Sequence, residues 1–224
     1  MAKTARTILE AKNYDLPLRL CAERLGDDVA AEAWADAERR LDGLLGSSRG
    51  LTRAERLHTD GQIFPACAIY LAIKERDAQA ALDILTTWKR EAALDKGAAL
   101  NRATSSLVAS RAFLKGFGVV TKAAFGPSAG FEEHIYEASS TRLRMDVTVC
   151  PYVRHCTECG CPEITRLFCD CDEYCYGSLP HISFSRSGTL AKGDARCDFE
   201  LTLLRSTRDD ATVPVAVSAG PLTT

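Results

Sequence analysis

Thiol and carboxylate side chains gather in one stretch of this sequence, and they are the residues best suited to carry chemistry. Of the ten cysteines, seven fall between Cys150 and Cys175. Cys169 and Asp172 are three residues apart, so on a helix they would share one face. A carboxylate beside a thiol can accept the thiol proton or deliver a proton to a leaving group. The spacing therefore indicates cysteine-dependent nucleophilic catalysis.

Such a thiol also needs a cationic or dipolar neighbour, because a nearby carboxylate by itself raises the pKa of the thiol. His134, His155, Arg186 or the N-terminus of a helix could supply it. Cys150 precedes Pro151 where a predicted strand passes into a helix, so its sulfur could face free backbone N–H groups. Cys150 is therefore a second candidate nucleophile, and His155 is a candidate base or ligand.

The same cysteines allow a metal site as an alternative. Two pairs, separated by eleven residues, have a spacing close to that of structural zinc sites: Cys156 and Cys159, then Cys171 and Cys175. Cys161 or Cys169 could replace one of these four. Four thiolates in a tetrahedral arrangement favour zinc, and the bound ion would hold a loop-rich region together in a structural or regulatory module. The catalytic hypothesis, by contrast, requires no cofactor.

Residues 1–126 are predicted to form a helical region that positions these groups. Helices are expected over residues 30–45, 51–61, 65–73, 77–93 and 100–115. Thr52 and Glu55 have the spacing of a capping box, and Pro65 suits the first turn of a helix. Cys21 and Cys67 lie in apolar helical settings, which is typical of core cysteines.

Residues 127–205 are predicted to form a Cys-rich α+β region. Strands are expected over residues 133–138, 143–149, 182–190 and 197–204, and a helix over 163–176. The fold class is thus α+β: a helical N-terminal half, then a small antiparallel sheet with an inserted Cys-rich helix. Residues 206–224 show little pattern and are predicted to be a mobile tail.

The composition excludes several classes of partner. The chain has 224 residues, 46% of them apolar and 26% charged, which is typical of a globular protein. A net charge of −2 and a pI near 6.1 argue against nucleic acid or an anionic membrane as a partner. No secretory signal or membrane-spanning segment is evident, so we expect a cytoplasmic protein with reduced thiols.

One block near the end resembles a known family. Between Phe184 and Phe199 the chain reads FSRSGTLAKGDARCDF, which resembles the C-terminal signature of the L-2-amino-thiazoline-4-carboxylic acid hydrolase family. Val149-Cys150-Pro151-Tyr152 and Cys169-Asp170-Cys171-Asp172 agree with the same family. The resemblance implies a helical segment leading into an α+β region. It also implies hydrolytic opening of a small nitrogen heterocycle, with a thiazoline carboxylic acid as the named substrate and a carbamoyl-cysteine as product.

The resemblance also implies a set of site residues. The matching positions that carry suitable groups are Cys150, Cys169, Asp172, Cys197 and Asp198. A thiolate could attack the electrophilic ring carbon, and a proton must then reach the departing heteroatom. Arg186 or Lys192 could bind the carboxylate of this small-molecule substrate. Cys156, Cys159, Cys161 and Cys175 are not needed by the family pattern, which leaves them for a zinc site or a modified pocket.

A third hypothesis rests on three residues. The Cys-x-x-Asp motif at Cys169 and Asp172, together with a distant cysteine, is similar to the trio of the alkylmercury lyases. There, thiolates hold a soft metal while the carboxylate supplies a proton.

Overall fold

The computed structural model describes residues 4–204, and it confirms the predicted α+β fold. The predicted tail, residues 206–224, lies outside the described residues. The helices are α1 (Ala5–Leu9), α2 (Asp15–Leu25), α3 (Asp27–Ser47), α4 (Arg53–His58), α5 (Phe64–Lys74), α6 (Ala78–Ala103), α7 (Leu107–Ala124), α8 (Pro151–Glu158) and α9 (Thr165–Tyr176). The strands are β1 (Glu132–Ala138), β2 (Arg142–Val149), β3 (Ile182–Ser185) and β4 (Cys197–Leu203).

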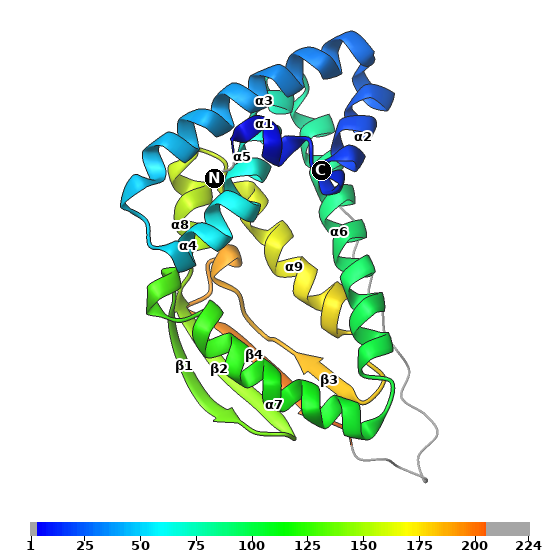
Figure 1. Cartoon of the computed structure of the whole chain (residues 1–224), viewed down its shortest axis with the longest axis vertical. Coiled ribbons are helices and arrows are strands. Elements are labelled where there is room, and N and C mark those ends of the chain that lie inside the picture. The colour runs from blue at the N-terminus through cyan, green and yellow to red at the C-terminus, as the bar shows by residue number, and fades with distance from the viewer. Residues whose placement is uncertain (1–3, 205–224) are drawn as a thin grey trace.

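The N-terminal helices pack around α5, which is apolar on nearly all sides. Ile69 and Ile73 of α5 are fully buried, and Leu71 is partly buried. Pro65 stands in the first turn of α5, and the Thr52 hydroxyl accepts a 3.0 Å hydrogen bond from the Glu55 N–H at the start of α4. These helices form the upper part of the molecule in Figure 1, and the sheet forms the lower part.

The boundary between α6 and α7 differs from the prediction of one helix over residues 100–115. The chain breaks after Ala103, and Ser106 caps a new helix by accepting the Ala109 N–H. Gly116 and Gly118 lie within α7, although the helix was expected to end at residue 115. A Cβ atom at Gly118 would lie 3.0 Å from the Ala138 side chain, so this glycine lets α7 approach the sheet. Glycine in a helix can thus reflect close packing rather than termination.

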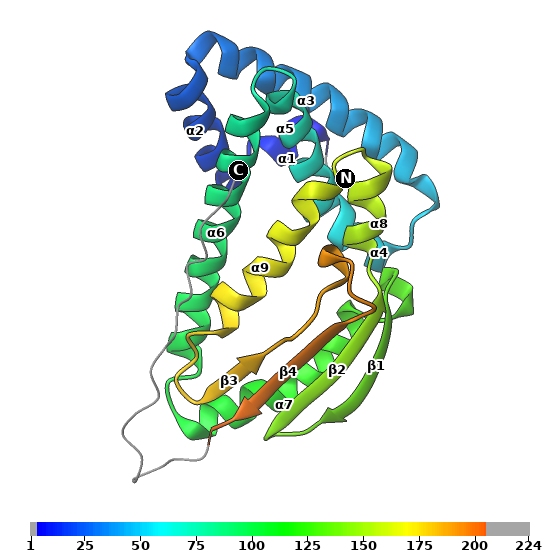
Figure 2. The same cartoon turned by 180° about the vertical axis from the view of Figure 1, so that it is seen from behind.

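The four strands form one antiparallel sheet in the order β1-β2-β4-β3. Opposed residues of β2 and β4 give the sheet one apolar face, with Leu143 opposite Leu201 and Met145 opposite Phe199. Val147 and Cys197, the next pair along this face, continue the same row. Helix α7 crosses this face in Figure 1, and Figure 2 shows the opposite face of the sheet toward the viewer.

Strand β3 ends at Ser185, although a strand over 182–190 was predicted. The Asp198 carboxylate accepts the N–H groups of Ser187 at 2.9 Å and Gly188 at 2.7 Å, which takes those groups away from strand pairing. The chain then forms a short 3-10 turn, Leu190–Lys192, before β4 begins.

No helix within residues 4–204 combines the length and apolarity needed to cross a membrane.

Candidate active site

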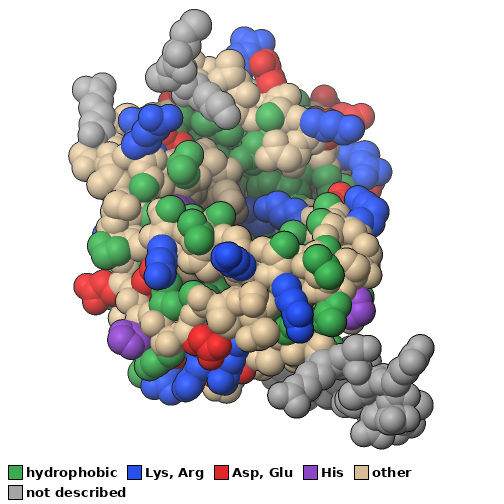
Figure 3. All heavy atoms as spheres, turned by 60° about the horizontal axis from the view of Figure 1, so that its bottom comes forward, with side chains coloured by type: hydrophobic (Ala, Val, Ile, Leu, Met, Phe, Trp, Pro, Cys, Tyr) green, Lys and Arg blue, Asp and Glu red, His purple; other side chains and the backbone are tan. Residues whose placement is uncertain are grey.

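A cavity of about 290 Å³ lies between the apolar face of the sheet, α6 and α9. It gathers four residues that the sequence singled out as catalytic, from a strand end, a helix and a second strand: Cys150, Cys169, Asp172 and Cys197. Arg186 also lines it. Figure 3 shows a hollow of this kind, with hydrophobic side chains inside and Lys or Arg side chains beside it.

Helix α9 carries Cys169 and Asp172 one turn apart on the face that lines the cavity. Helix α6 supports α9 through an unusually close backbone contact. A Cβ atom at Gly97 of α6 would lie only 2.6 Å from the carbonyl oxygen of Tyr174. This contact fixes one wall of the cavity.

Arg186 holds the cavity-facing part of α9 in place. Its guanidinium donates one hydrogen bond of 3.0 Å to Asp172 Oδ2 and another of 3.0 Å to the carbonyl oxygen of Cys169. A third contact, 3.1 Å long, reaches Glu173 Oε1. The Arg186 side chain is only 4% exposed, so these contacts exclude most water. Its donors are therefore largely used by α9, although the sequence made it a candidate for a substrate carboxylate.

Asp172 is a carboxyl group with an unusual affinity for protons. Burial raises its pKa to about 6, and the attraction of Arg186 only partly opposes this effect. A carboxyl with a pKa near 6 can both accept and return a proton near neutral pH, as general acid–base catalysis requires.

Three of the five thiols that line the cavity, those of Cys150, Cys169 and Cys197, are partly buried and favour the neutral form. Burial raises the pKa of Cys169 to about 12 and that of Cys150 to about 11, and it also raises the pKa of Cys197. The Arg186 charge lowers the pKa of Cys169 in part. The neighbouring groups Cys197, Cys150 and Asp172 raise it. In the resting protein these thiols are therefore mostly protonated at neutral pH.

Backbone N–H groups face two of these thiols. Cys150 precedes α8, and the N–H groups of Tyr152 and Val153 lower its pKa against the larger effect of burial. Cys197 accepts a 3.2 Å hydrogen bond from the N–H of Leu190. Cys150 thus stands at a helix N-terminus, where the sequence placed it.

Lys89 is a cavity residue that the sequence analysis missed. It lies on α6, with its ammonium group 4.4 Å from the centre of the Phe168 ring. Burial lowers its pKa to about 8, and no carboxylate is among the main groups acting on it. From sequence alone, a lysine next to Trp88 on an amphipathic helix would be expected to face solvent. Only the packing of α6 on α9 reveals a cation facing the cavity.

Aromatic side chains form most of the remaining wall. They come from α7, α8, α9, β4 and the segment before β1: Phe117, Phe125, Phe131, Tyr152, Phe168, Tyr176 and Phe199. The Tyr152 hydroxyl is 3.0 Å from His58 Nδ1, and His58 Nε2 is 2.7 Å from the carbonyl oxygen of Ala124. Such a wall suits a flat ring and weakens competition from water.

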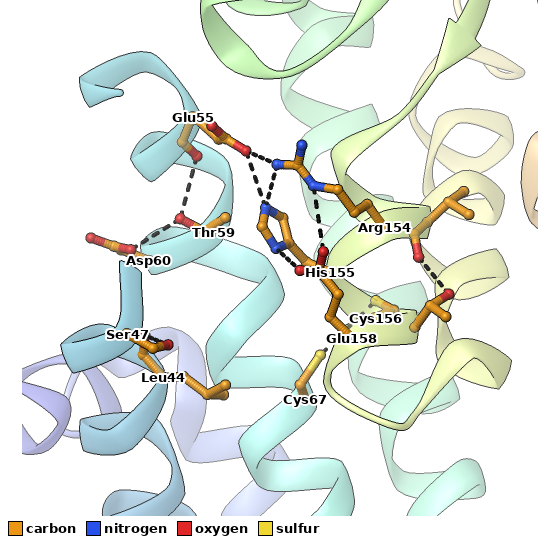
Figure 4. Close-up of polar contacts among 12 residues, drawn as sticks. Leu44, Ser47, Glu55, Thr59, Asp60, Cys67, Arg154, His155, Cys156 and Glu158 are labelled. Carbon is orange, nitrogen blue, oxygen red and sulfur yellow. Dashed lines mark hydrogen bonds and ion pairs between the residues drawn. The ribbon is translucent and has the colours of Figure 1, made fainter. Parts of the chain in front are cut away.

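Three predicted substrate-binding residues lie outside the cavity lining. Lys192 is exposed on the 3-10 turn. Asp198 lies on β4 and its carboxylate is occupied by backbone N–H groups of the turn that follows β3. His155 is buried between two carboxylates, with Nε2 3.1 Å from Glu55 Oε1 and Nδ1 3.0 Å from Glu158 Oε2. Figure 4 shows this ring linking α4 to α8, a connection that Arg154 reinforces by binding Glu55.

The four cysteines proposed as one zinc site do not meet. Cys171 and Cys175 lie on α9 and contact the carbonyl oxygens of Lys89 and Ala93 on α6. Cys156 instead lies 4.0 Å from Cys67 of α5, sulfur to sulfur. Helix α9 carries the second pair away from the end of α8, so the expected set needs correction. Within residues 4–204, no group of three or more Cys, His, Asp or Glu side chains is arranged, as it stands, to hold a metal ion.

The comparisons with known proteins give one match. A family model described as L-2-amino-thiazoline-4-carboxylic acid hydrolase matches residues 56–201. No curated protein and no solved structure matches the chain. The matched range includes α5, α6 and every residue of the cavity described above.

Proposed function

This chain belongs to the L-2-amino-thiazoline-4-carboxylic acid hydrolase family, and from that premise we propose that it opens a small nitrogen heterocycle by cysteine-dependent hydrolysis. The observation that carries the proposal is the cavity itself. Its lining includes five thiols, a carboxyl with a pKa near 6 and two lysines, one of them the half-buried Lys89, and aromatic side chains enclose these groups. These groups match the steps that such a reaction requires.

The ring carbon of a 2-aminothiazoline is bonded to nitrogen and sulfur and is electrophilic, as in an amidine. In the proposed first step, Asp172 takes the proton of Cys169 as the sulfur attacks this carbon. The two groups lie on one helix face, and Arg186 holds the carboxylate of Asp172. A carboxyl of raised pKa is a stronger base than ordinary aspartate, which favours this transfer.

In the second step the bond between the ring carbon and the ring sulfur breaks. The departing sulfur receives the proton from Asp172 and becomes the thiol of the opened product. Water then adds to the carbon that is still bound to Cys169, and the enzyme thiol is released. The net change is the addition of one water molecule, without a cofactor.

The substrate carboxylate is proposed to bind Lys89. This ammonium group lines the cavity without a carboxylate among its main neighbours, whereas Arg186 already binds Asp172 and Glu173. A substrate anion would provide the partner that burial otherwise denies the lysine. This assignment replaces the earlier expectation for Arg186 or Lys192.

The experiment is an activity assay on the purified full chain with 2-aminothiazoline-4-carboxylate and a panel of related carboxylated rings. Opening the thiazoline releases a thiol, which a colorimetric thiol reagent detects, and mass spectrometry should show the addition of one water. The Cys169→Ala variant should be inactive, whereas Cys21→Ala, which removes a buried thiol from α2, should retain turnover. A wild-type protein that hydrates none of these rings would contradict the proposal.

A further inference from the structure

A second group of thiols lies apart from the cavity, around Cys67 of α5. The sulfur atoms of Cys67 and Cys156 are 4.0 Å apart, and the thiols of Cys159 and Cys161 lie near enough to Cys67 to interact with it. Cys67, Cys156 and Cys161 are fully buried, and Cys159 is partly exposed. Figure 4 shows Cys67 and Cys156 pointing toward each other between α5 and α8. None of the four belongs to the cavity lining.

The local backbone explains why three of these thiols converge. Helix α8 ends at Glu158, and Gly160 then adopts a positive φ of 77°, a conformation that other residues rarely accept. The Cys161 N–H donates a 2.9 Å hydrogen bond to the carbonyl oxygen of Cys156, which closes the turn. The turn brings Cys156, Cys159 and Cys161 to one side of the chain, facing Cys67.

A neighbouring hydroxyl group provides independent support. Thr165 is 2% exposed, and its Oγ1 atom has no hydrogen-bond partner at ordinary geometry among the described residues. The atom it faces is the sulfur of Cys156. A thiol accepts hydrogen bonds weakly, whereas a thiolate accepts them strongly. The unsatisfied hydroxyl is therefore explained if Cys156 is a thiolate in the functional protein.

We propose that Cys67, Cys156, Cys159 and Cys161 bind one thiophilic divalent cation, zinc in the first instance. The ion replaces the four thiol protons, which pass to solvent, and no oxidant or reductant is needed. With Zn–S bonds of about 2.3 Å, the sulfurs of a tetrahedral site lie about 3.8 Å apart, close to the 4.0 Å between Cys67 and Cys156. The partly exposed Cys159 provides the entry side, and small shifts would bring the thiols from mutual contact to a shared ion.

The distance also bears on the kind of metal centre. A [4Fe–4S] cluster binds each cysteine to a different iron and would hold the sulfur atoms farther apart, whereas the observed contact fits a single ion. The site would join α5 to α8 and to the segment that leads into α9, which carries Cys169 and Asp172. Its role is therefore structural, and it does not depend on the proposed hydrolysis.

The test is metal analysis of the full chain, purified without chelator in the presence of added zinc. We expect about one zinc per chain in the wild type and in Cys21→Ser, which changes a buried cysteine of α2. Cys67→Ser and Cys159→Ser should each lose most of the bound zinc, and Cys159→Ser guards against misfolding because its side chain is partly exposed. Circular dichroism of each variant confirms that the fold is retained.

A second measurement uses cobalt as the probe. Co²⁺ added to the metal-free chain should give the visible and near-ultraviolet absorption of tetrahedral thiolate coordination, and both variants should lack it. A wild-type chain that binds neither ion would overturn the proposal. So would variants that keep one metal per chain, a disulfide between the four cysteines, or the spectrum of an iron–sulfur cluster.

Discussion

The guanidinium of Arg186 binds Asp172 Oδ2 at 3.0 Å and, through its other terminal nitrogen, the carbonyl oxygen of Cys169 at 3.0 Å. One side chain thus fixes both the carboxyl group and the backbone of the residue that carries the proposed nucleophile.

Asp172 should control the acid limb of the pH–rate profile. Because its pKa is about 6, it is mostly ionised at neutral pH and becomes protonated as the pH falls through 6. If the ionised form is the base, kcat/KM should rise with pH up to about 6 and then level off. Asp172→Asn should reduce turnover by at least about 100-fold, which is typical for loss of a general base.

The same variant should not lower the melting temperature near neutral pH. The folded protein binds the Asp172 proton more tightly than the unfolded chain does, so any stability gained from the protonated form is lost as the pH rises through about 6. Replacing this ionised and partly buried carboxylate by an amide therefore removes a free-energy cost. A large loss of stability in Asp172→Asn would contradict this view of the site.

Arg186 should act through Asp172. Its charge lowers the pKa of that carboxyl, so Arg186→Met should shift the acid limb of kcat/KM upward by about one pH unit or more. Arg186→Lys keeps the charge but cannot reproduce the three contacts of the planar group. Compared with Arg186→Met, it should therefore return the acid limb toward its wild-type pH, while turnover recovers less. A purely structural arginine would change the rate but leave the limb in place.

The raised thiol pKa values predict slow alkylation at rest. Cys169, with a pKa of about 12, should react with iodoacetamide only slowly at pH 7, and the rate should rise about tenfold for each pH unit up to pH 9. Substrate bound in the cavity should protect it. Peptide mapping identifies the labelled residue, and preferential labelling of Cys150 or Cys197 would move the nucleophile to that residue.

Part of this site could be predicted from sequence, because its signals are local. The spacing of Cys169 and Asp172 defines a shared helix face, and the order Cys150-Pro151 marks the passage from strand to helix. These are relations within a few residues, which periodicity and capping rules describe well.

The remaining features depend on contacts that no local pattern contains. Lys89 enters the cavity only because α6 packs on α9, about 80 residues later, and Cys67 meets Cys156 across 89 residues. The predicted zinc set failed for the same reason, since spacing along the chain cannot show that α9 carries Cys171 and Cys175 to α6. The end of β3 likewise depends on the Asp198 side chain from the next strand.

Lys89 and Lys192 should separate the two hypotheses for the substrate carboxylate. Lys89→Met should raise KM by about 10- to 100-fold with a smaller effect on kcat, because the lost contact serves mainly binding. Lys192→Met, at an exposed position, should leave KM unchanged. The KM for a ring analogue without the carboxylate should be the same in both variants as in the wild type. In the wild type, kcat/KM should fall above pH 8, as Lys89 loses its charge.

Gly97 should be required for the close packing of α6 on α9. Alanine is favoured over glycine in a helix by about 1 kcal/mol, but a Cβ atom at this position would lie 2.6 Å from the backbone oxygen of Tyr174. A backbone oxygen cannot turn away as a side chain can, so the helices must separate. We expect Gly97→Ala to lower the free energy of unfolding by about 1–3 kcal/mol, the usual cost of overpacking.

Gly43→Ala on α3 is the matched control, because nothing lies within 4 Å of a Cβ atom there. It should raise stability by about 0.5–1 kcal/mol through helix propensity alone. Denaturant unfolding of the two variants therefore gives changes of opposite sign. Since α9 carries Cys169 and Asp172, Gly97→Ala should also reduce turnover in the fraction that remains folded, whereas Gly43→Ala should not. Equal behaviour of the two variants would show that the approach of α6 to α9 is not what sets the cavity wall.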